Sequence, residues 1–244
     1  MRLDLYLADN ALVDSRTDAK NFILAGAVSV DGKVIKKPAF DVSGNEDISV
    51  DKTGKRFVSR GGLKLEGALD SFGIDVSGVM AIDIGASSGG FTDCLLKRGA
   101  THVIAVDSGS GQMVESLRRD PRVTVIENFN ARYMSQSDFE YAPDIAVMDV
   151  SFISAKLIIP AVGNIIKPNG KFICLIKPQF EVGRGGLNKK GIVKNDSLRK
   201  SAVNDVVDFA IHCGFELDGL IESPIVGGDG NVEYLAHFVK KINV

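Results

Sequence analysis

The larger, carboxy-terminal part of the chain alternates between short apolar runs and segments with helical periodicity. The apolar runs are rich in Val, Ile and Ala and cover residues 79–84, 103–107, 123–126, 144–150 and 171–177. An apolar stripe over residues 65–72 and the pattern of residues 91–97 predict helices. Strands that are apolar throughout are typical of a parallel sheet covered on both faces. The pattern therefore predicts a doubly wound, mostly parallel α/β domain over residues 63–244.

Residues 1–51 show a different pattern, with short helical segments and short strands. The predicted strands cover residues 28–30, 33–35 and 47–50. Ser15 is a typical N-cap of a helix, and Gly26 is a typical helix end. Asp31-Gly32 has the composition of a two-residue hairpin turn. We therefore expect a small α+β domain here, joined to the larger domain by a linker over residues 52–62.

The net charge of −2 excludes a chain that is strongly basic as a whole, but the charge is unevenly distributed. Residues 1–64 hold 11 Lys and Arg against 9 Asp and Glu, whereas the rest holds 18 against 22. The run KTGKRFVSRGGLK, residues 52–64, has five basic residues and no acidic one. Charge alone leaves a solvated surface and a binding patch open. Gly61 and Gly62 would make this run a basic hinge that lets the two domains reorient.

The cysteines and the start of the chain give a prediction of cellular location. Cys94, Cys174 and Cys213 are far apart, and no pair has the spacing of a metal site. They are expected to be buried free thiols in a reducing compartment. The start MRLDLYLADN is charged, unlike a signal peptide, and no apolar stretch approaches 18 residues. We therefore expect a cytoplasmic protein that binds neither a metal nor a membrane.

The segment DIGASSGGF, residues 83–91, follows the first apolar run and opens a helix. Glycines there let the backbone approach a ligand closely. Their spacing is G-x-x-x-G-G, which differs from the G-x-G-x-x-G of dinucleotide sites, and Asp83 adds an acid at the strand end. An acid suits a cationic ligand better than a pyrophosphate, which favours S-adenosylmethionine. The candidate cofactor residues in this segment are Asp83, Gly85, Ser87, Ser88, Gly89, Gly90 and Phe91.

Three further polar residues follow the next two apolar runs. Asp107 ends the second run, where a carboxylate can accept both ribose hydroxyls of a nucleoside. Asn128 and Asn130 follow the third run and would lie near the adenine by the same topology. The alternative is purely structural: Asp83 caps a helix and Asp107 merely ends a strand.

Charged residues also occur near the ends of three predicted strands, where ligands bind in open α/β sheets. Asp149 in MDVSF ends the fourth run, Lys177 in LIKPQFE ends the fifth, and Glu233 lies in the apolar-flanked segment GNVEYL. Buried charges are costly and are normally paired. The residues themselves leave open a structural Asp–Lys ion pair and a catalytic group.

The amino-terminal domain resembles the S-four type RNA-binding domain. The matching motifs are Arg2-Leu3-Asp4, Ser15-Arg16-x-x-Ala19, Gly26-x-Val28-x-Val30-Asp31-Gly32 and Ile48-x-Val50. The resemblance implies that basic residues on a two-helix face contact structured RNA. With the basic run added, the candidate RNA-binding residues are Arg2, Arg16, Lys20, Lys33, Lys55, Arg56 and Arg60. Each of them could instead be an ordinary surface charge.

The chain as a whole resembles the TlyA/hemolysin A family, a branch of the FtsJ-like ribose 2′-O-methyltransferases. The matching motifs are SRGGLKL, DIGASSGGF, MDVSF, LIKPQFE and GNVEY. The resemblance implies a Rossmann-like class I methyltransferase that uses S-adenosylmethionine. Its Lys-Asp-Lys-Glu tetrad falls on Lys64, Asp149, Lys177 and Glu233. It also implies methylation of cytidine in ribosomal RNA, so ribosomal RNA or a ribosomal subunit is the expected partner. The extent of the chain is like that of the shorter family form, which is associated with the large subunit alone.

The tetrad gives each of these residues an expected role. A ribose hydroxyl is a poor nucleophile near neutral pH, so a base must remove its proton, and a lysine can do so only when neutral. We expect Lys177 to be the base and Asp149 to orient Lys177 and the methyl donor. We expect Glu233 to pair with Lys64 and to hold the ribose. Lys64 would then be a catalytic residue. Charge and glycine content alone suggest instead that it is a solvated residue of a linker.

Two other functions compete with this hypothesis. The family name suggests a membrane-lysing protein, which the charged start and the lack of a long apolar stretch disfavour. An RNA-binding adaptor without catalysis is disfavoured by the complete tetrad. Leakage from liposomes would test the first alternative, and a calorimetric titration with S-adenosylmethionine would test the second. The sequence makes no prediction of oligomeric state.

Overall fold

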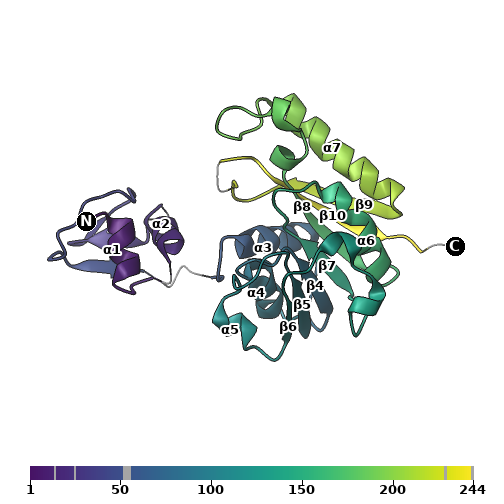
Figure 1. The fold of residues 1–244 in the computed structure, drawn as a ribbon, viewed down its shortest axis with the longest axis horizontal. Coiled ribbons are helices and arrows are strands. Elements are labelled where there is room, and N and C mark those ends of the chain that lie inside the picture. The colour runs from purple at the N-terminus through teal and green to yellow at the C-terminus, as the bar shows by residue number, and fades with distance from the viewer. Residues whose placement is uncertain (14, 25, 52–55, 228–229, 243–244) are drawn as a thin grey trace. The chain divides into compact units, whose positions relative to one another are not determined.

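The computed structural model describes residues 1–13, 15–24, 26–51, 56–227 and 230–242. The chain divides into two compact units, Met1–Arg56 and Phe57–Val244 (Figure 1). Each unit has a hydrophobic core of its own.

The small unit combines two helices with a three-stranded antiparallel sheet. Its elements are α1 (Leu3–Asp9), α2 (Arg16–Leu24), β1 (Val28–Val30), β2 (Lys33–Val34) and β3 (Ile48–Val50). The strand order is β2-β1-β3, and both pairs are antiparallel. Asp31 and Gly32 have φ values of 48° and 74°, as the tight turn of a two-residue hairpin requires. The predicted hairpin is therefore confirmed.

A seven-stranded sheet forms the centre of the larger unit, in the order β6-β5-β4-β7-β8-β10-β9. Its parallel strands are β4 (Met80–Ile84), β5 (His102–Val106), β6 (Val123–Ile126), β7 (Ile145–Met148) and β8 (Lys171–Ile176). All pairs among these strands are parallel. The apolar runs of the sequence thus form the mostly parallel sheet that they predict.

Two antiparallel strands, β9 (Phe215–Glu222) and β10 (Tyr234–Lys240), complete this sheet. β10 is antiparallel to both β8 and β9, and Tyr234 pairs with Ile176. The chain just before β10 therefore lies at the carboxyl end of β8. Glu233, expected within a strand, is the residue immediately before β10. β9 was not predicted, because its apolar residues alternate with polar ones in an edge strand.

Helices cover both faces of the large sheet (Figure 1). They are α3 (Gly61–Phe72), α4 (Gly90–Lys97) and α5 (Glu115–Arg118) on one face, and α6 (Ile159–Ile165) and α7 (Asp196–His212) on the other. On the first face, Leu65 and Leu95 belong to a buried cluster with Val103 of the sheet. On the second face, Val162 and Val206 belong to a separate cluster. Within the described residues, no helix is both long and apolar enough to cross a membrane.

Residues 57–62 differ from the linker that the sequence suggests. Phe57 is buried, and a Cβ added to Gly62 would lie 2.3 Å from the Phe57 ring. Gly61 and Gly62 form the start of α3, so they are closely packed helical residues where a free hinge was expected. The physical reason is the contact of Phe57 with the core, which a pattern of charges and glycines cannot show. Residues 52–55 lie outside the described residues.

Candidate active site

Lys177 and Asp149 form an ion pair at the carboxyl edge of the parallel strands. Asp149 follows the last residue of β7, and Lys177 follows the last residue of the neighbouring strand β8. Lys177 Nζ lies 2.5 Å from Asp149 Oδ1 and donates a hydrogen bond of 2.7 Å to Ser151 Oγ. The side chains of Lys177 and Asp149 are 11% and 21% exposed, so the pair is shielded but open to a ligand.

Lys64 and Glu233 form a second ion pair, which is more deeply buried. Lys64 Nζ donates to Glu233 Oε2 at 2.5 Å, and the two side chains are 9% and 3% exposed. The other oxygen, Glu233 Oε1, accepts a hydrogen bond of 3.1 Å from Gln179 Nε2. Gln179 lies two residues after Lys177 and thus connects the second pair to the segment that carries the first. The expected pairing of Lys64 with Glu233 is present.

The topology explains how residues so distant in the sequence meet. Glu233 precedes an antiparallel strand, so it lies beside the carboxyl end of β8. Lys64 is in the first turn of α3, a helix that packs against β10. A Cβ added to Gly227 would lie 2.5 Å from Glu233 Oε1, so the backbone of that loop covers the carboxylate. Helix, strand and loop together bury this pair.

The glycine-rich loop between β4 and α4 lies next to the ion pairs. Gly85 has a φ of 82°, and a Cβ there would lie 2.6 Å from the backbone oxygen of Asp149. Gly89 has a φ of 94°, in the left-handed region that favours glycine. A Cβ on Gly90 would lie 2.2 Å from Ser59 Oγ, so this glycine lets α4 approach the start of α3. These glycines are required by close packing on both sides of the loop.

Asp107 holds two loops at the end of β5. Its Oδ2 accepts from Ser87 N at 2.8 Å, and its Oδ1 accepts from Gly109 N at 2.7 Å. Ser87, with a φ of 47°, also donates from Oγ to Gln112 Oε1 at 2.9 Å. Ser88 is half-buried in the same loop. Asp107 thus fixes the glycine-rich loop as well as ending a strand.

Asp83 is fully buried in β4 and is not exposed on the surface of the loop. Its Oδ2 accepts from Thr92 N at 2.9 Å and from Thr92 Oγ1 at 2.6 Å. The carboxylate therefore caps the start of α4, as the structural alternative expects. Oδ1 has no hydrogen-bond partner among the residues described. Burial raises the pKa of Asp83 to about 7; the bonds from Thr92 oppose this rise, and the charges of Asp149 and Asp107 add to it.

The remaining candidate cofactor residues have different environments. Phe91 is 3% exposed and belongs to the core beneath α4, so its side chain packs against protein rather than facing a ligand. Asn128 is exposed, with a φ of 56°, in the loop after β6. Asn130 is also exposed, and its side chain accepts a bond of 3.2 Å from Arg132 N. Both asparagine side chains are thus exposed in the segment that follows β6.

Phe152 is an exposed aromatic residue close to the first ion pair that the sequence did not single out. It is 91% exposed and has a φ of 63°, a strained conformation for a bulky residue. Its ring centroid lies 5.2 Å from that of Phe180, whose ring is in turn 6.0 Å from Lys177 Nζ. The only signal in the sequence was its position three residues after Asp149. Strained residues of this kind are concentrated at functional sites.

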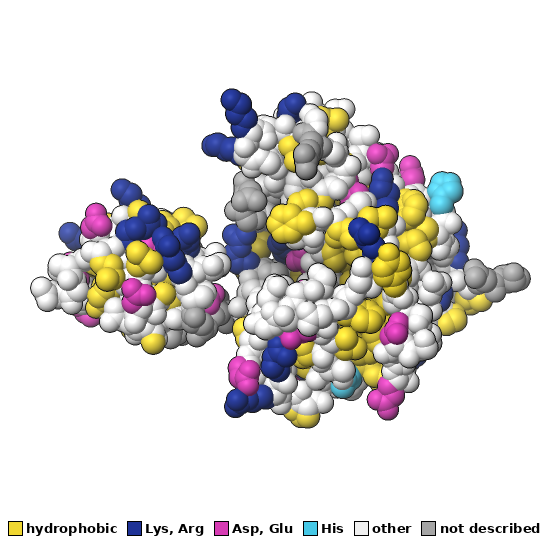
Figure 2. All heavy atoms as spheres, in the orientation of Figure 1, with side chains coloured by type: hydrophobic (Ala, Val, Ile, Leu, Met, Phe, Trp, Pro, Cys, Tyr) yellow, Lys and Arg dark blue, Asp and Glu magenta, His cyan; other side chains and the backbone are white. Residues whose placement is uncertain are grey.

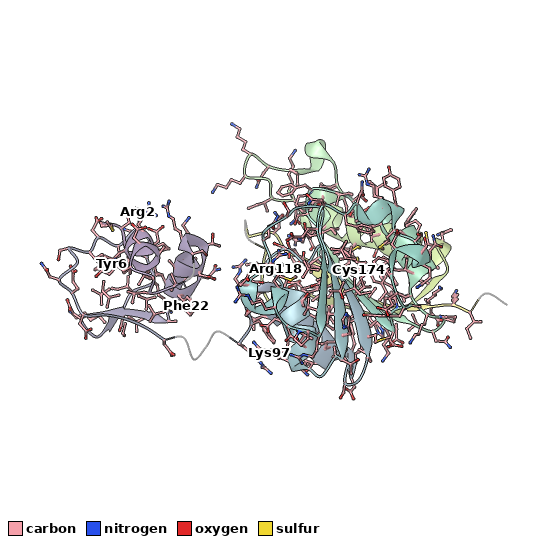
Figure 3. The ribbon with its side chains drawn as sticks, turned by 60° about the horizontal axis from the view of Figure 1, so that its bottom comes forward. Arg2, Tyr6, Phe22, Lys97, Arg118 and Cys174 are labelled. Atoms are coloured by element: carbon pink, nitrogen blue, oxygen red, sulfur yellow. The ribbon has the colours of Figure 1, made fainter. Side chains whose placement is uncertain are left out.

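In the small unit, a buried carboxylate holds two of the candidate RNA-binding residues. Arg2, at the start of α1 (Figure 3), donates to Asp4 Oδ1 at 2.9 Å and Oδ2 at 3.1 Å. Arg16 donates to Asp4 Oδ2 at 3.1 Å. The hydrogen bond from Arg2 is the main cause that keeps the pKa of Asp4 below its usual value. The arginine side chains remain 43% and 48% exposed, and Lys20 and Lys33 are also exposed.

Of the other candidate RNA-binding residues, Arg56 is the last residue of the small unit and Arg60 belongs to the larger one. Arg56 and Arg60 are exposed, and Arg60 Nη2 donates to Val226 O at 3.4 Å. Lys55 lies outside the described residues.

The cysteines are free, and Cys174 lies in the central sheet (Figure 3). In the described part of the chain, no cluster of His, Cys, Asp and Glu has the composition of a metal site.

Comparison with known proteins identifies the family. Residues 57–240 match the FtsJ-like methyltransferase family, and residues 1–48 match the S4 domain. Hemolysin A of Brachyspira hyodysenteriae is 44% identical over 240 residues, 98% of this chain and 100% of that protein. The 16S/23S rRNA (cytidine-2'-O)-methyltransferase TlyA of Mycobacterium tuberculosis is 43% identical over 234 residues, 96% of this chain and 87% of that protein. The structure of a hemolysin candidate from Streptococcus thermophilus is 43% identical, with a TM-score of 0.80 over 99% of this chain and 88% of that chain. The chain therefore belongs to the FtsJ-like methyltransferase family and carries an S4 domain at its amino terminus.

Proposed function

We propose that this protein methylates the 2′-hydroxyl of a cytidine ribose in ribosomal RNA, with S-adenosylmethionine as the methyl donor and the cytoplasm as its location. The observation that carries this proposal is the presence of two ion pairs, Lys177–Asp149 and Lys64–Glu233, at the sheet edge beside a glycine-rich loop. Membership of the FtsJ-like family supports the reaction type. The name of the mycobacterial relative supports cytidine in ribosomal RNA as the substrate.

The residues around the glycine-rich loop suit S-adenosylmethionine. Gly85 and Gly89 give the loop its left-handed backbone turns beside the sheet edge, and Asp107 retains lone pairs for ribose hydroxyls. The unpartnered oxygen of Asp83 lies beneath the same loop, and its carboxylate favours a cationic ligand. When bound, S-adenosylmethionine supplies a methyl group attached to a positively charged sulfonium. Exposed Asn128 and Asn130 are available for the adenine.

Lys177 is the proposed base. Its Nζ is reachable from the sheet edge and is held by Asp149 and Ser151, which fix its direction. To act, it must lose its own proton and then accept the proton of the ribose hydroxyl. Correct placement of the hydroxyl supplies much of the acceleration in an in-line displacement. The position of Lys177 is therefore as important as its protonation state.

The second ion pair and the exposed aromatic are proposed to hold the nucleotide. Lys64, Glu233 and the half-buried Gln179 form a connected group, which can orient a ribose without moving itself. Phe152 offers an exposed ring for stacking, and base–aromatic stacking contributes about 1–3 kcal/mol per base. Phe180 supports this ring from one side. The ring of Phe152 is exposed to water in the absence of RNA, and this exposure leaves it free to stack on a base.

Mapping of ribose methylation by mass spectrometry tests the proposed function directly. Ribosomal subunits from cells that lack this protein are incubated with purified protein and S-adenosylmethionine. We expect 2′-O-methylcytidine to appear at a defined position in the ribosomal RNA. The absence of any new ribose methylation on both subunits would refute the proposal.

Replacement of Lys177 tests the base. We expect Lys177→Ala to lower the single-turnover rate at least ~100-fold, the lower range for loss of a general base, with little change in cofactor affinity. Lys177→Arg keeps a cation beside Asp149 but cannot release its proton, so it should lose as much activity. The matched control is Lys171→Ala at the start of the same strand, which should keep the rate. Near-normal rates for both variants of Lys177 would exclude its role as the base.

A further inference from the structure

The chain carries a second basic run that none of the roles above uses. Residues 182–195 contain Arg184, Lys189, Lys190 and Lys194 and no acidic residue. The run precedes α7 (Figure 1), and basic side chains project from this part of the larger unit (Figure 2). Several like charges without a counter-charge create a local positive potential, which attracts anions.

The acidic residues that flank this run are already engaged. Both oxygens of Glu181 accept hydrogen bonds, from Ser154 Oγ at 2.6 Å and from Ala155 N at 2.8 Å. Asp196 forms ion pairs with two basic residues of α7. Lys189 and Lys190 are exposed, and no ion pair joins either of them to a carboxylate within the described residues. Their charge is therefore directed to solvent.

The two lysines lie at the tip of an ordered turn. Asn188 Oδ1 accepts from Lys190 N at 2.8 Å and from Ile192 N at 3.1 Å. Asn188 N donates to Ile192 O at 2.9 Å, and Gly191 has the φ of 74° that closes the turn. Backbone that is fixed in this way presents Lys189 and Lys190 at a defined place. An ordered presentation lowers the entropy cost of binding.

The turn is also anchored next to the second ion pair. Asn231 is 3% exposed; its Oδ1 accepts from Val193 N at 3.2 Å, and its Nδ2 donates to Gly191 O at 3.1 Å. Asn231 lies only two residues before Glu233. One buried amide thus ties the basic turn to the segment that carries an active-site carboxylate.

We propose that Lys189 and Lys190 bind the phosphate backbone of the RNA strand that carries the target nucleotide. The inference rests on the proposed function, because it takes RNA as the methyl acceptor. Lysine is a suitable point charge for phosphate, and phosphate contacts fix the register of a strand without selecting its sequence. An acidic protein is a poorer fit, since protein interfaces use exposed apolar anchors, and no large apolar side chain of the described part of residues 182–195 is exposed.

The test compares three double variants of the full-length protein. Lys189→Ala with Lys190→Ala removes both charges, and Lys189→Arg with Lys190→Arg keeps them. Lys167→Ala with Lys241→Ala is the matched control, because both residues lie at the opposite edge of the sheet. The readouts are methylation kinetics on ribosomal subunits and binding of protein-free ribosomal RNA over a range of salt concentrations.

We expect the alanine pair at 189 and 190 to raise KM about tenfold with a smaller change in kcat. It should also reduce the slope of log affinity against log salt by about 1.4 to 1.8, the value for two lost phosphate contacts. The arginine pair and the control should behave as wild type. Unchanged KM and unchanged slope, with active wild-type enzyme, would overturn the inference and leave the proposed function intact.

Other outcomes separate the inference from the proposed function. If the wild type methylated no RNA, the proposed function would fail. Binding of the protein-free RNA would still test the inference. Weaker binding by the alanine pair than by the wild type would support it, and equal binding would refute it. A defect on intact subunits without a defect on protein-free RNA would assign the turn to a ribosomal protein and refute it. Wild-type protein that binds no RNA would refute both.

Discussion

At the scale of single residues, the buried carboxylate of Asp83 gives a prediction about pH. Burial raises its pKa to about 7, far above the ordinary value of 3.8. The folded protein therefore holds a proton that the unfolded chain releases, so this group makes the fold progressively less stable as the pH rises from about 4 to about 7. Above that range the carboxylate is charged in the folded state as well. Under the proposed function, a cationic cofactor bound near Asp83 favours its charged form, and cofactor binding would then be linked to proton release.

We expect S-adenosylmethionine to bind about tenfold more tightly at pH 8 than at pH 6 through this group, because only the ionised form of Asp83 attracts the ligand. Titration calorimetry in buffers with different ionisation enthalpies measures both the affinity and the released proton. Asp83→Asn is the control. It removes the pH dependence that comes from Asp83 and keeps any pH dependence that comes from titration of the ligand itself. A ratio of wild-type to variant affinity that stays constant from pH 6 to pH 8 would disprove the linkage.

At the scale of elements, the parallel strands could be predicted because continuous apolar runs between helical segments are typical of strands covered on both faces. Asp149 and Lys177 could be placed together for the same reason, since carboxyl ends of neighbouring parallel strands share an edge. The pairing of Lys64 with Glu233 could not be derived from pattern, because it depends on β10 running against β8. It was expected only from the family resemblance. The packing of Phe57 was missed because it is a tertiary contact.

The contact between α3 and α4 gives a prediction at this scale. A Cβ on Gly90 would lie 2.2 Å from Ser59 Oγ, which can rotate away, and 3.1 Å from the backbone nitrogen of Gly62, which cannot. Gly90→Ala must therefore shift the two helix starts by a few tenths of an ångström. We expect it to lower the free energy of unfolding by about 1–3 kcal/mol, the range for overpacking. Since the chain has no Trp, urea unfolding is followed by circular dichroism. Gly185→Ala, with no atom within 4 Å of its Cβ, should change nothing. Equal stability of the two variants would show that the contact between the starts of α3 and α4 adjusts to the added methyl group without loss of stability.

At the scale of the whole molecule, the two units carry different features. Both ion pairs and the glycine-rich loop belong to the unit that begins at Phe57, which has a core on each face of its sheet. The small unit has one modest core, and its half-exposed Arg2 and Arg16 are fixed by a buried carboxylate. Guanidinium groups that are held in place are suited to phosphate. The small unit should therefore add RNA affinity and leave cofactor affinity alone.

A chain that lacks residues 1–56 tests this division. We expect its affinity for S-adenosylmethionine to stay within about twofold of the full-length value, because no described residue of the loop or the ion pairs is lost. The deletion removes six candidate RNA-binding residues, Arg2, Arg16, Lys20, Lys33, Lys55 and Arg56. Their loss should weaken binding to ribosomal RNA and reduce the slope of log affinity against log salt by about 4 to 5. Filter binding over a range of salt concentrations measures this slope, and circular dichroism verifies that the shortened chain is folded. If the slope were unchanged, the basic residues of the small unit would be ordinary surface charges. RNA recognition would then rest on the larger unit, where Arg60, Lys189 and Lys190 are the proposed contacts.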